Sequence, residues 1–304
     1  LMIVKNDGTS LYATRDLATD KFRLETYGRD VVIINEVGIE QSLYFKQLYE
    51  VEKMLGWFKD GQRIHIGHGH YRFKEGKMST RKGNVIWLED IIDEAIKRAY
   101  GISAGGSRGK IGLERPFSKH PEASERLLNI KPRPLNEVEK NLADIANDVA
   151  IGALKWNDLK RNYSQDIVFD WDDILNMQGN SGPYLQYTFA RTQSVLGKWR
   201  VENGELRVEN FDFHDDFTPE IEEEILLRTL IKFDDVLQSS STNFAPNILC
   251  LYLFDLSQKY NLFYQKHAIL NSKTESFRLA LTFAVGKTLK EGLKLLGISA
   301  PEKM

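Results

Sequence analysis

The chain has 304 residues, 42% of them hydrophobic, which is enough apolar material for two domains with separate cores. Its formal net charge is only −2, so no overall basic excess points to nucleic acid, and such a partner must meet local patches. The one cysteine, Cys250, excludes a disulfide framework and a cysteine-rich zinc site, and it fits a reducing cytoplasm. No run approaches the roughly eighteen apolar residues of a membrane helix.

The first hundred residues predict alternating helices and strands. An apolar run at residues 1–4 leads into an Asn-Asp-Gly turn, so we expect the chain to open inside a strand and to be a piece of a longer protein. Periodic spacing predicts helices at 14–27, 41–55 and 88–100, and apolar or alternating runs predict strands at 31–34, 63–68 and 71–74. This order is typical of a parallel α/β sheet.

The second half of the chain predicts a helical bundle. Residues 101–134 are punctuated by Gly and Pro with little periodicity, which indicates a linker or a surface insertion. Helical spacing then dominates residues 135–161, 182–199, 219–238, 246–266 and 274–296. Pro219 and Pro246 lie where helix starts tolerate proline. One face of the last helix is apolar at spacing four: Phe277, Leu281, Val285, Leu289 and Leu293.

Two short strings look like motifs of nucleotide-activating enzymes: HIGH at 65–68 and KMSTRKGN at 77–84. In class I aminoacyl-tRNA synthetases these motifs come from opposite halves of the fold, whereas here eight residues separate His68 from Lys77. A working HIGH also needs a helix start that faces the triphosphate, but the residues after His68 alternate like a strand. We therefore interpret this HIGH as a chance string on a strand and expect the functional one upstream of Leu1.

The second string has the chemistry of a phosphate loop. Lys77, Arg81 and Lys82 stand beside the hydroxyls of Ser79 and Thr80 in a Gly-flanked loop, which offers mobile positive charge to a pyrophosphate leaving group. The alternative is a solvated basic loop, which charge alone would favour. The ordered string favours the phosphate loop.

Longer strings resemble the arginyl-tRNA synthetases, which are class Ia aminoacyl-tRNA synthetases. Besides KMSTRKGN, a form of that family's KMSKS loop, they are DGTSLYATRDLA (7–18), EQSLYFKQL (40–48), GNSGPYLQYTFAR (179–191) and LKLLGISAPEKM (293–304). The resemblance implies an α/β plus all-α chain: the second half of a Rossmann-like catalytic domain at 1–100, a linker or insertion at 101–134, and a helical anticodon-binding domain at 135–304. It further implies ATP-dependent activation of L-arginine and its transfer to tRNA(Arg) by a monomer, with this piece inactive alone.

The resemblance also implies site residues in the phosphate loop. Lys77, Ser79 and Lys82 would be catalytic, and ATP would meet Lys77, Met78, Ser79, Thr80 and Arg81. One departure is that Thr80 stands where KMSKS usually has its second lysine. Lys77, Lys82 or a lysine upstream of Leu1 would take over its role.

Recognition of arginine requires a carboxylate that faces the guanidinium fork. Tyr12 and Asp16 are spaced i, i+4 at a helix start, and Gln41 follows a strand, where open α/β sheets bind ligands. By resemblance, Asp16 would bind the guanidinium while Tyr12 and Gln41 line the pocket. The alternative is that Tyr12 packs and Asp16 only stabilises the helix start.

Single-stranded RNA is read by stacking splayed bases on aromatic side chains. By resemblance, the candidates for contact with tRNA are Tyr184, Tyr187, Tyr264, His267 and Met304, and Lys198 and Arg200 would meet phosphates. The alternative for an aromatic residue on a bundle helix is core packing.

We assign no metal ligands. Three carboxylates within four residues, Asp170, Asp172 and Asp173, could bind a cation, but a carboxylate-rich helix start explains them better. His68 and His70 have no further ligand nearby, and Mg²⁺ would arrive with ATP. Two rival functions stay open: a tRNA-binding module without chemistry, and another adenylyltransferase of the same fold, which would not need the helical half.

Overall fold

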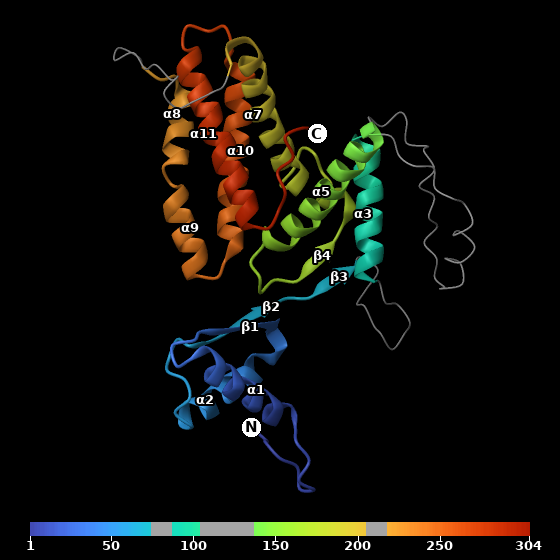
Figure 1. The fold of residues 1–304 in the computed structure, drawn as a ribbon, viewed down its shortest axis with the longest axis vertical. Coiled ribbons are helices and arrows are strands. Elements are labelled where there is room, and N and C mark those ends of the chain that lie inside the picture. Colours follow the sequence, from blue (N-terminus) through green and yellow to red (C-terminus); the bar gives the residue numbers. More distant parts are fainter. Residues whose placement is uncertain (74–86, 104–136, 205–217) are drawn as a thin grey trace, which may run out of the picture. The chain divides into compact units, whose positions relative to one another are not determined.

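The computed structural model describes residues 1–73, 87–103, 137–204 and 218–304, which form two compact units (Figure 1). The first unit contains Leu1–Arg72 with Asn162–Val168, and the second contains Phe73–Arg161 with Phe169–Met304. The domain boundaries predicted at residues 100 and 134 stay predictions, because the segment between them lies almost wholly outside the described residues.

The first unit is built on two parallel strands, as predicted. β1 (Ile33–Gly38) pairs with β2 (Arg63–His68), so that Ile33 lies opposite Arg63 and Gly38 lies opposite His68. The other elements of this unit are α1 (Tyr12–Tyr27), the 3-10 turn η1 (Ile39–Gln41) and α2 (Ser42–Met54). Because parallel strands end at the same edge of a sheet, the segments after Gly38 and His68 start side by side.

Two predictions at the N-terminal end were wrong in detail. β1 begins later than the predicted strand at 31–34, because the N–H of Val31 bonds the carbonyl of Gly28 and still belongs to the turn after α1. The apolar N-terminal run forms only an isolated antiparallel bridge between Val4 and Ser10. A run of four apolar residues is too short to specify a strand without a pairing partner.

A small apolar core lies between α1 and α2 and contains Leu17, Phe45 and Leu48. Beside it, Arg63 of β2 pairs with Asp20 of α1 and Glu52 of α2, although all three side chains are buried. Burial, followed by a hydrogen bond shared with Asp20, raises the pKa of Glu52 to about 8. One guanidinium thus joins two helices and the sheet.

The second unit confirms the predicted helical bundle. Its helices are α3 (Leu88–Ser103), α5 (Glu137–Leu159), α6 (Trp171–Ile174), α7 (Gly182–Asn203), α8 (Ile221–Leu230), α9 (Phe233–Thr242), α10 (Pro246–Lys266) and α11 (Glu275–Leu295). α10 packs against α7, α8, α9 and α11, and α3 packs along α5 (Figure 1). Among the described helices, none combines the length and the apolar character needed to cross a membrane.

The single helix predicted at 219–238 is instead two helices. α8 ends when the N–H of Lys232 bonds the carbonyl of Thr229, three residues back, and α9 begins directly afterwards. Neither Gly nor Pro marks this break, so the sequence pattern carries no signal for it.

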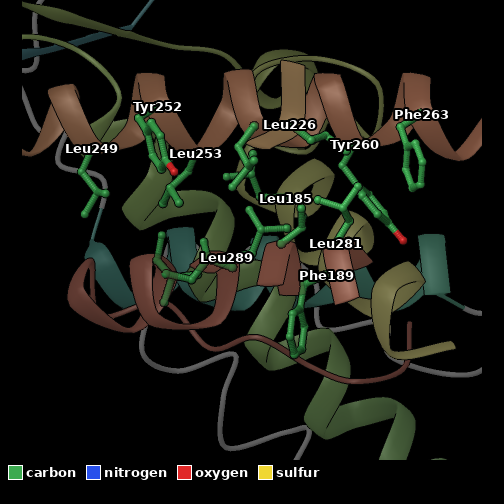
Figure 2. Packing of buried hydrophobic residues seen from close by; sticks show 14 of the residues in the cluster. Leu185, Phe189, Leu226, Leu249, Tyr252, Leu253, Tyr260, Phe263, Leu281 and Leu289 are labelled. Atoms are coloured by element: carbon green, nitrogen blue, oxygen red, sulfur yellow. The ribbon is translucent and has the colours of Figure 1, made fainter. Parts of the chain in front are cut away.

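The core of the bundle is formed by large side chains of α7, α8, α10 and α11 (Figure 2). On α11, the predicted face is buried at Leu281, Val285, Leu289 and Leu293, and Phe277 packs at its edge. From α10, Tyr260 and Phe263 are fully buried. Gly182 lets α7 lie close to α5, since a Cβ there would stand 2.5 Å from the carbonyl oxygen of Gly152.

A short strand that the sequence pattern did not predict, β4 (Ile167–Phe169), pairs with β3 (Tyr71–Phe73). The N–H of Ile167 donates to the carbonyl of His70 at 2.9 Å, and the N–H of His70 donates to Asp166 Oδ1 at 2.8 Å. Segment 162–168 therefore folds into the first unit, although the flanking α5 and α6 belong to the second.

Candidate functional site

On α1, Tyr12 and Asp16 stand one turn apart at the helix start, as predicted. Tyr44 of α2 donates its hydroxyl to Asp16 Oδ2, and burial followed by this bond raises the pKa of Tyr44. Tyr12 is 80% exposed, and Asp16 is partly exposed. Asp16 is thus an oriented carboxylate that a guanidinium fork could approach from solvent. Tyr44 was missed, although it follows Gln41 by one helical turn.

Gln41 ends η1 and precedes the first residue of α2, so it lies just beyond the C-terminal end of β1, as predicted. Its side chain is exposed. Because Tyr44 lies on the first turn of the same helix and contacts Asp16, the start of α2 is brought near that carboxylate. A direct role for Gln41 stays a prediction.

The HIGH string lies on β2, which confirms the strand interpretation. His65 stacks on Phe45 with ring centroids 4.6 Å apart, and its Nε2 lies 3.2 Å from the carbonyl oxygen of Val37. His68 closes the strand, and its Nε2 is 3.5 Å from Glu36. These histidines support the sheet and do not open a helix.

The phosphate loop cannot be placed. Its string at 77–84 lies outside the described residues, between the end of β3 at Phe73 and the start of α3 at Leu88. The roles of Lys77, Met78, Ser79, Thr80, Arg81 and Lys82 therefore stay predictions.

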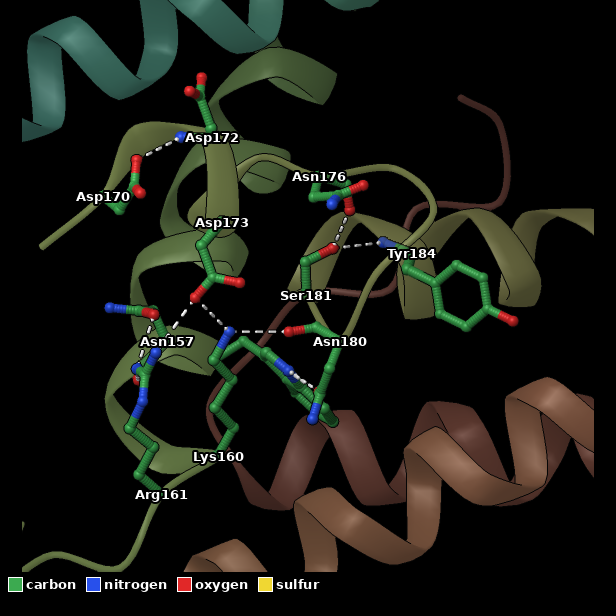
Figure 3. A network of polar contacts seen from close by, with 11 residues as sticks. Asn157, Lys160, Arg161, Asp170, Asp172, Asp173, Asn176, Asn180, Ser181 and Tyr184 are labelled. Atoms are coloured by element: carbon green, nitrogen blue, oxygen red, sulfur yellow. Dashed lines mark hydrogen bonds and ion pairs between the residues drawn. The ribbon is translucent and has the colours of Figure 1, made fainter. Parts of the chain in front are cut away.

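The carboxylates at 170–173 form a helix start, which confirms the interpretation chosen over a metal site. Asp170 caps α6, since its Oδ1 accepts the N–H of Asp172 at 3.1 Å (Figure 3). Asp173 accepts hydrogen bonds from Lys160 and Arg161, each at 3.0 Å. Burial lowers the pKa of Lys160, while its bond to Asp173 acts in the opposite direction.

The loop before α7 is fixed by side chains of α5. Lys160 also donates to the carbonyl of Asn180 at 2.8 Å, and the Trp156 indole N–H donates to Asn180 Oδ1 at 2.8 Å. Ser181 then caps α7 by accepting the N–H of Tyr184 (Figure 3). This capping places Tyr184 on the first turn of a rigid helix.

Two of the predicted tyrosines, Tyr187 and Tyr264, are brought together by one arginine. Tyr187 on α7 and Tyr264 on α10 are each 40% exposed. The guanidinium carbon of Arg191 lies 5.0 Å from the ring centre of Tyr187 and 4.9 Å from that of Tyr264. This exposed group can accept a base by stacking and can supply charge to a phosphate. Arg191 was missed as a site residue, although it follows Tyr187 by four residues.

Tyr184 is more deeply placed than the other two. It packs against Phe254 with ring centroids 5.6 Å apart, and its hydroxyl accepts a hydrogen bond from Asn261 at 2.9 Å. Lys198 and Arg200 are exposed near the C-terminal end of the same helix.

Residues 185–304 match the family described as the DALR anticodon binding domain, and residues 1–112 match the family described as tRNA synthetases class I (R), catalytic domain. The chain belongs to the arginyl-tRNA synthetase family. The first match includes Tyr187, Arg191 and Tyr264, and the second includes Tyr12 and Asp16.

Curated relatives and solved structures agree with this family. The arginine–tRNA ligases of Fusobacterium nucleatum and Clostridioides difficile are 38% and 35% identical to the chain, over 100% of it and 48% of each relative. The chain thus spans about half the length of the curated relatives that it matches. The arginyl-tRNA synthetase structures from Thermus thermophilus (TM-score 0.76) and Plasmodium falciparum (0.73) are each 22% identical and cover 100% and 99% of this chain, and 51% and 46% of theirs. They show the fold: part of a class I catalytic domain followed by a helical anticodon-binding domain.

Two further tRNA candidates have contacts within the bundle. His267 is largely buried, and its Nε2 lies 3.0 Å from Glu222, whose pKa is lowered to about 2 chiefly by Lys266 and then by His267. Met304 packs beside α3 and α5 near Ala146. Contact of either residue with RNA stays a prediction.

Proposed function

We propose that this chain is part of an arginine–tRNA ligase, which activates L-arginine with ATP and transfers the arginyl group to the terminal adenosine of tRNA(Arg). The match of residues 1–112 to a class I catalytic domain and the names of the relatives support this proposal. Mg²⁺ would enter as part of the ATP substrate. Catalysis would rest on positioning and charge stabilisation, with no covalent enzyme intermediate.

In the proposed arginine site, Asp16 pairs with the substrate guanidinium, while Tyr12 and Gln41 line the pocket. The contact between Tyr44 and Asp16 supports this role, because it orients the carboxylate that the planar fork must meet. Lys77, Ser79 and Lys82 would stabilise the leaving pyrophosphate, and Met78, Thr80 and Arg81 would contact ATP. The KMSTRKGN string supports these assignments.

The observation that carries the proposal is the pair of exposed tyrosines over which Arg191 lies. It falls within the match to an anticodon-binding domain, on two packed helices. We infer that splayed anticodon bases stack at Tyr187 and Tyr264 while Arg191 contacts a base edge or a phosphate. Tyr184, His267 and Met304 would complete the tRNA-binding surface.

A narrower function is proposed for the chain by itself: it binds tRNA and does not activate arginine. Its coverage of 48% of the relatives supports this, because a class I active site needs both halves of the catalytic domain. A monomer in the cytoplasm is part of the proposal, and the single buried cysteine suits a reducing compartment.

Binding of labelled tRNA(Arg) to the 304-residue chain tests the proposed function, with a tRNA altered only in its anticodon as control. We expect the altered tRNA to bind at least about tenfold more weakly, equivalent to about 1.4 kcal/mol. Equal binding of both by a folded chain would remove the anticodon-reading role. Arginine-dependent ATP–pyrophosphate exchange by the full-length protein would separate the ligase from another adenylyltransferase.

A further inference from the structure

A buried amide, Asn261, connects the half-buried Arg191 to the interior of the bundle. Asn261 lies on α10 and is 8% exposed. Its Oδ1 accepts a hydrogen bond from Arg191 Nη1, and its Nδ2 donates to the Tyr184 hydroxyl at 2.9 Å and to Thr188 Oγ1 at 3.0 Å. All three partners lie on α7, so this single side chain bonds one face of that helix over two turns.

The chemistry of the partners fixes the orientation of this amide. Arginine has donors only, so it must face the Asn261 oxygen. The Thr188 hydroxyl donates its hydrogen bond to the carbonyl of Tyr184, at 2.9 Å. Toward Asn261 it can therefore act only as an acceptor, and it accepts from the Asn261 nitrogen. A flipped amide would lose both bonds, so the side chain has one stable setting.

The orientation of the Asn261 amide determines which donor groups of Arg191 and Tyr184 remain available for a ligand. One terminal nitrogen of Arg191 is held by Asn261, which keeps the guanidinium over Tyr187 and Tyr264. Since the Tyr184 hydroxyl accepts from Asn261, its own proton can be donated to another acceptor. A base or phosphate would thus meet donors that are already aligned.

We propose that Asn261 is a positioning residue for RNA recognition: it presets Arg191, and through Arg191 it sets how strongly the chain prefers one anticodon over another. This inference rests on the proposed anticodon-reading function and deepens it. Asn261 itself is too buried to be a base-contacting residue. Its effect therefore passes through Arg191, and this makes the role separable from simple packing.

The chain offers a matched control in Asn157. This asparagine is 2% exposed, lies on α5, and accepts a bond from Arg161 Nη1 at 2.9 Å through its Oδ1. Asn157→Leu and Asn261→Leu therefore both remove a buried asparagine–arginine bond in the second unit. Only the second change removes a contact of Arg191, which lies over Tyr187 and Tyr264.

The experiment measures the dissociation constants of the 304-residue chain for two anticodon stem–loop RNAs, one with an arginine anticodon and one with a single anticodon base changed. The discrimination ratio is the dissociation constant for the RNA with the changed base divided by that for the RNA with the arginine anticodon. We expect Asn261→Leu to reduce this ratio by about tenfold. Asn261→Asp keeps an oxygen that faces Arg191 and should hold the ratio within about threefold of wild type, as should Asn157→Leu. In an Arg191→Gln background, Asn261→Leu should not weaken the binding of the RNA with the arginine anticodon any further.

An unchanged ratio in Asn261→Leu, or an additive loss in the double variant, would overturn the inference. If Asn261→Leu fails to fold, Thr188→Val takes its place, since it removes the acceptor that fixes the amide. A lowered ratio would then support the inference, and an unchanged ratio would overturn it. Failure of the proposed function is distinct, because the wild-type chain itself would then bind both RNAs equally.

Discussion

Arg63 and Asp20 form an ion pair inside the first unit, where their side chains are only 4% and 3% exposed. Removing Arg63 would leave Asp20 with only the half-exposed Arg23 as a counter-charge, and the fully buried Glu52 would lose its guanidinium partner. We expect Arg63→Met to lower the free energy of unfolding by about 3–5 kcal/mol, measured by urea denaturation. Lys53→Met, which breaks an exposed pair with Asp60, should have no measurable effect. Equal stability of the two variants would contradict this role.

The same cluster predicts a pH dependence of stability. Glu52 keeps its proton up to about pH 8 in the folded chain but only to about 4.5 when unfolded. Between these values the folded state binds more protons than the unfolded state, so the free energy of unfolding falls as the pH rises. Glu52→Gln should abolish this slope in denaturation curves recorded across that window. A slope retained in full by the variant would show that another group causes it.

Two glycines of α7 should respond in opposite directions to alanine. A Cβ at Gly182 would stand 2.5 Å from the backbone oxygen of Gly152, whereas one at Gly197 would meet nothing within 4 Å. We expect Gly182→Ala to destabilise the chain by about 1–3 kcal/mol through overpacking. Gly197→Ala should stabilise it by up to about 1 kcal/mol, because alanine is the better helix former. Thermal unfolding of both variants checks the pair, and the same sign for both would refute the close approach of α5 and α7.

Tyr44 should matter for arginine binding through Asp16. In the proposed full-length ligase, Tyr44→Phe removes a hydrogen bond to a carboxylate, and we expect the KM for arginine to rise roughly tenfold, about 1.4 kcal/mol. Tyr49→Phe removes a hydroxyl that bonds Asn35 and is the control. If the two variants had the same KM in the exchange assay, Tyr44 would not be a positioning residue.

The helices and strands were largely predictable, because the apolar residues of each recur at the spacing typical of a helix or of a strand. β2 has the predicted bounds, and α10 begins at Pro246, where proline is tolerated. The break at 231–232 was not predictable, since it depends on how α8 and α9 pack and not on a Gly or Pro. β4 was missed because three residues are too few for a pattern, and its pairing with β3 spans about a hundred residues of sequence.

The candidate sites were predictable in part. The i, i+4 spacing of Tyr12 and Asp16 is local, so the helix start that carries them was foreseen. In contrast, the guanidinium of Arg191 on α7 lies over Tyr264 of α10, a residue more than seventy positions further along the chain. Long-range contacts of this kind leave no trace in periodicity or spacing.

The most direct test of RNA reading by the helical half compares Arg191→Gln with Arg161→Gln. Both arginines bond a buried asparagine, but only Arg191 lies over exposed tyrosines. The measurement is the dissociation constant for the anticodon-altered tRNA divided by that for tRNA(Arg). We expect Arg191→Gln to bring the ratio close to one, while Arg161→Gln retains the wild-type value. A folded Arg191→Gln chain that still discriminates as well as wild type would contradict the account.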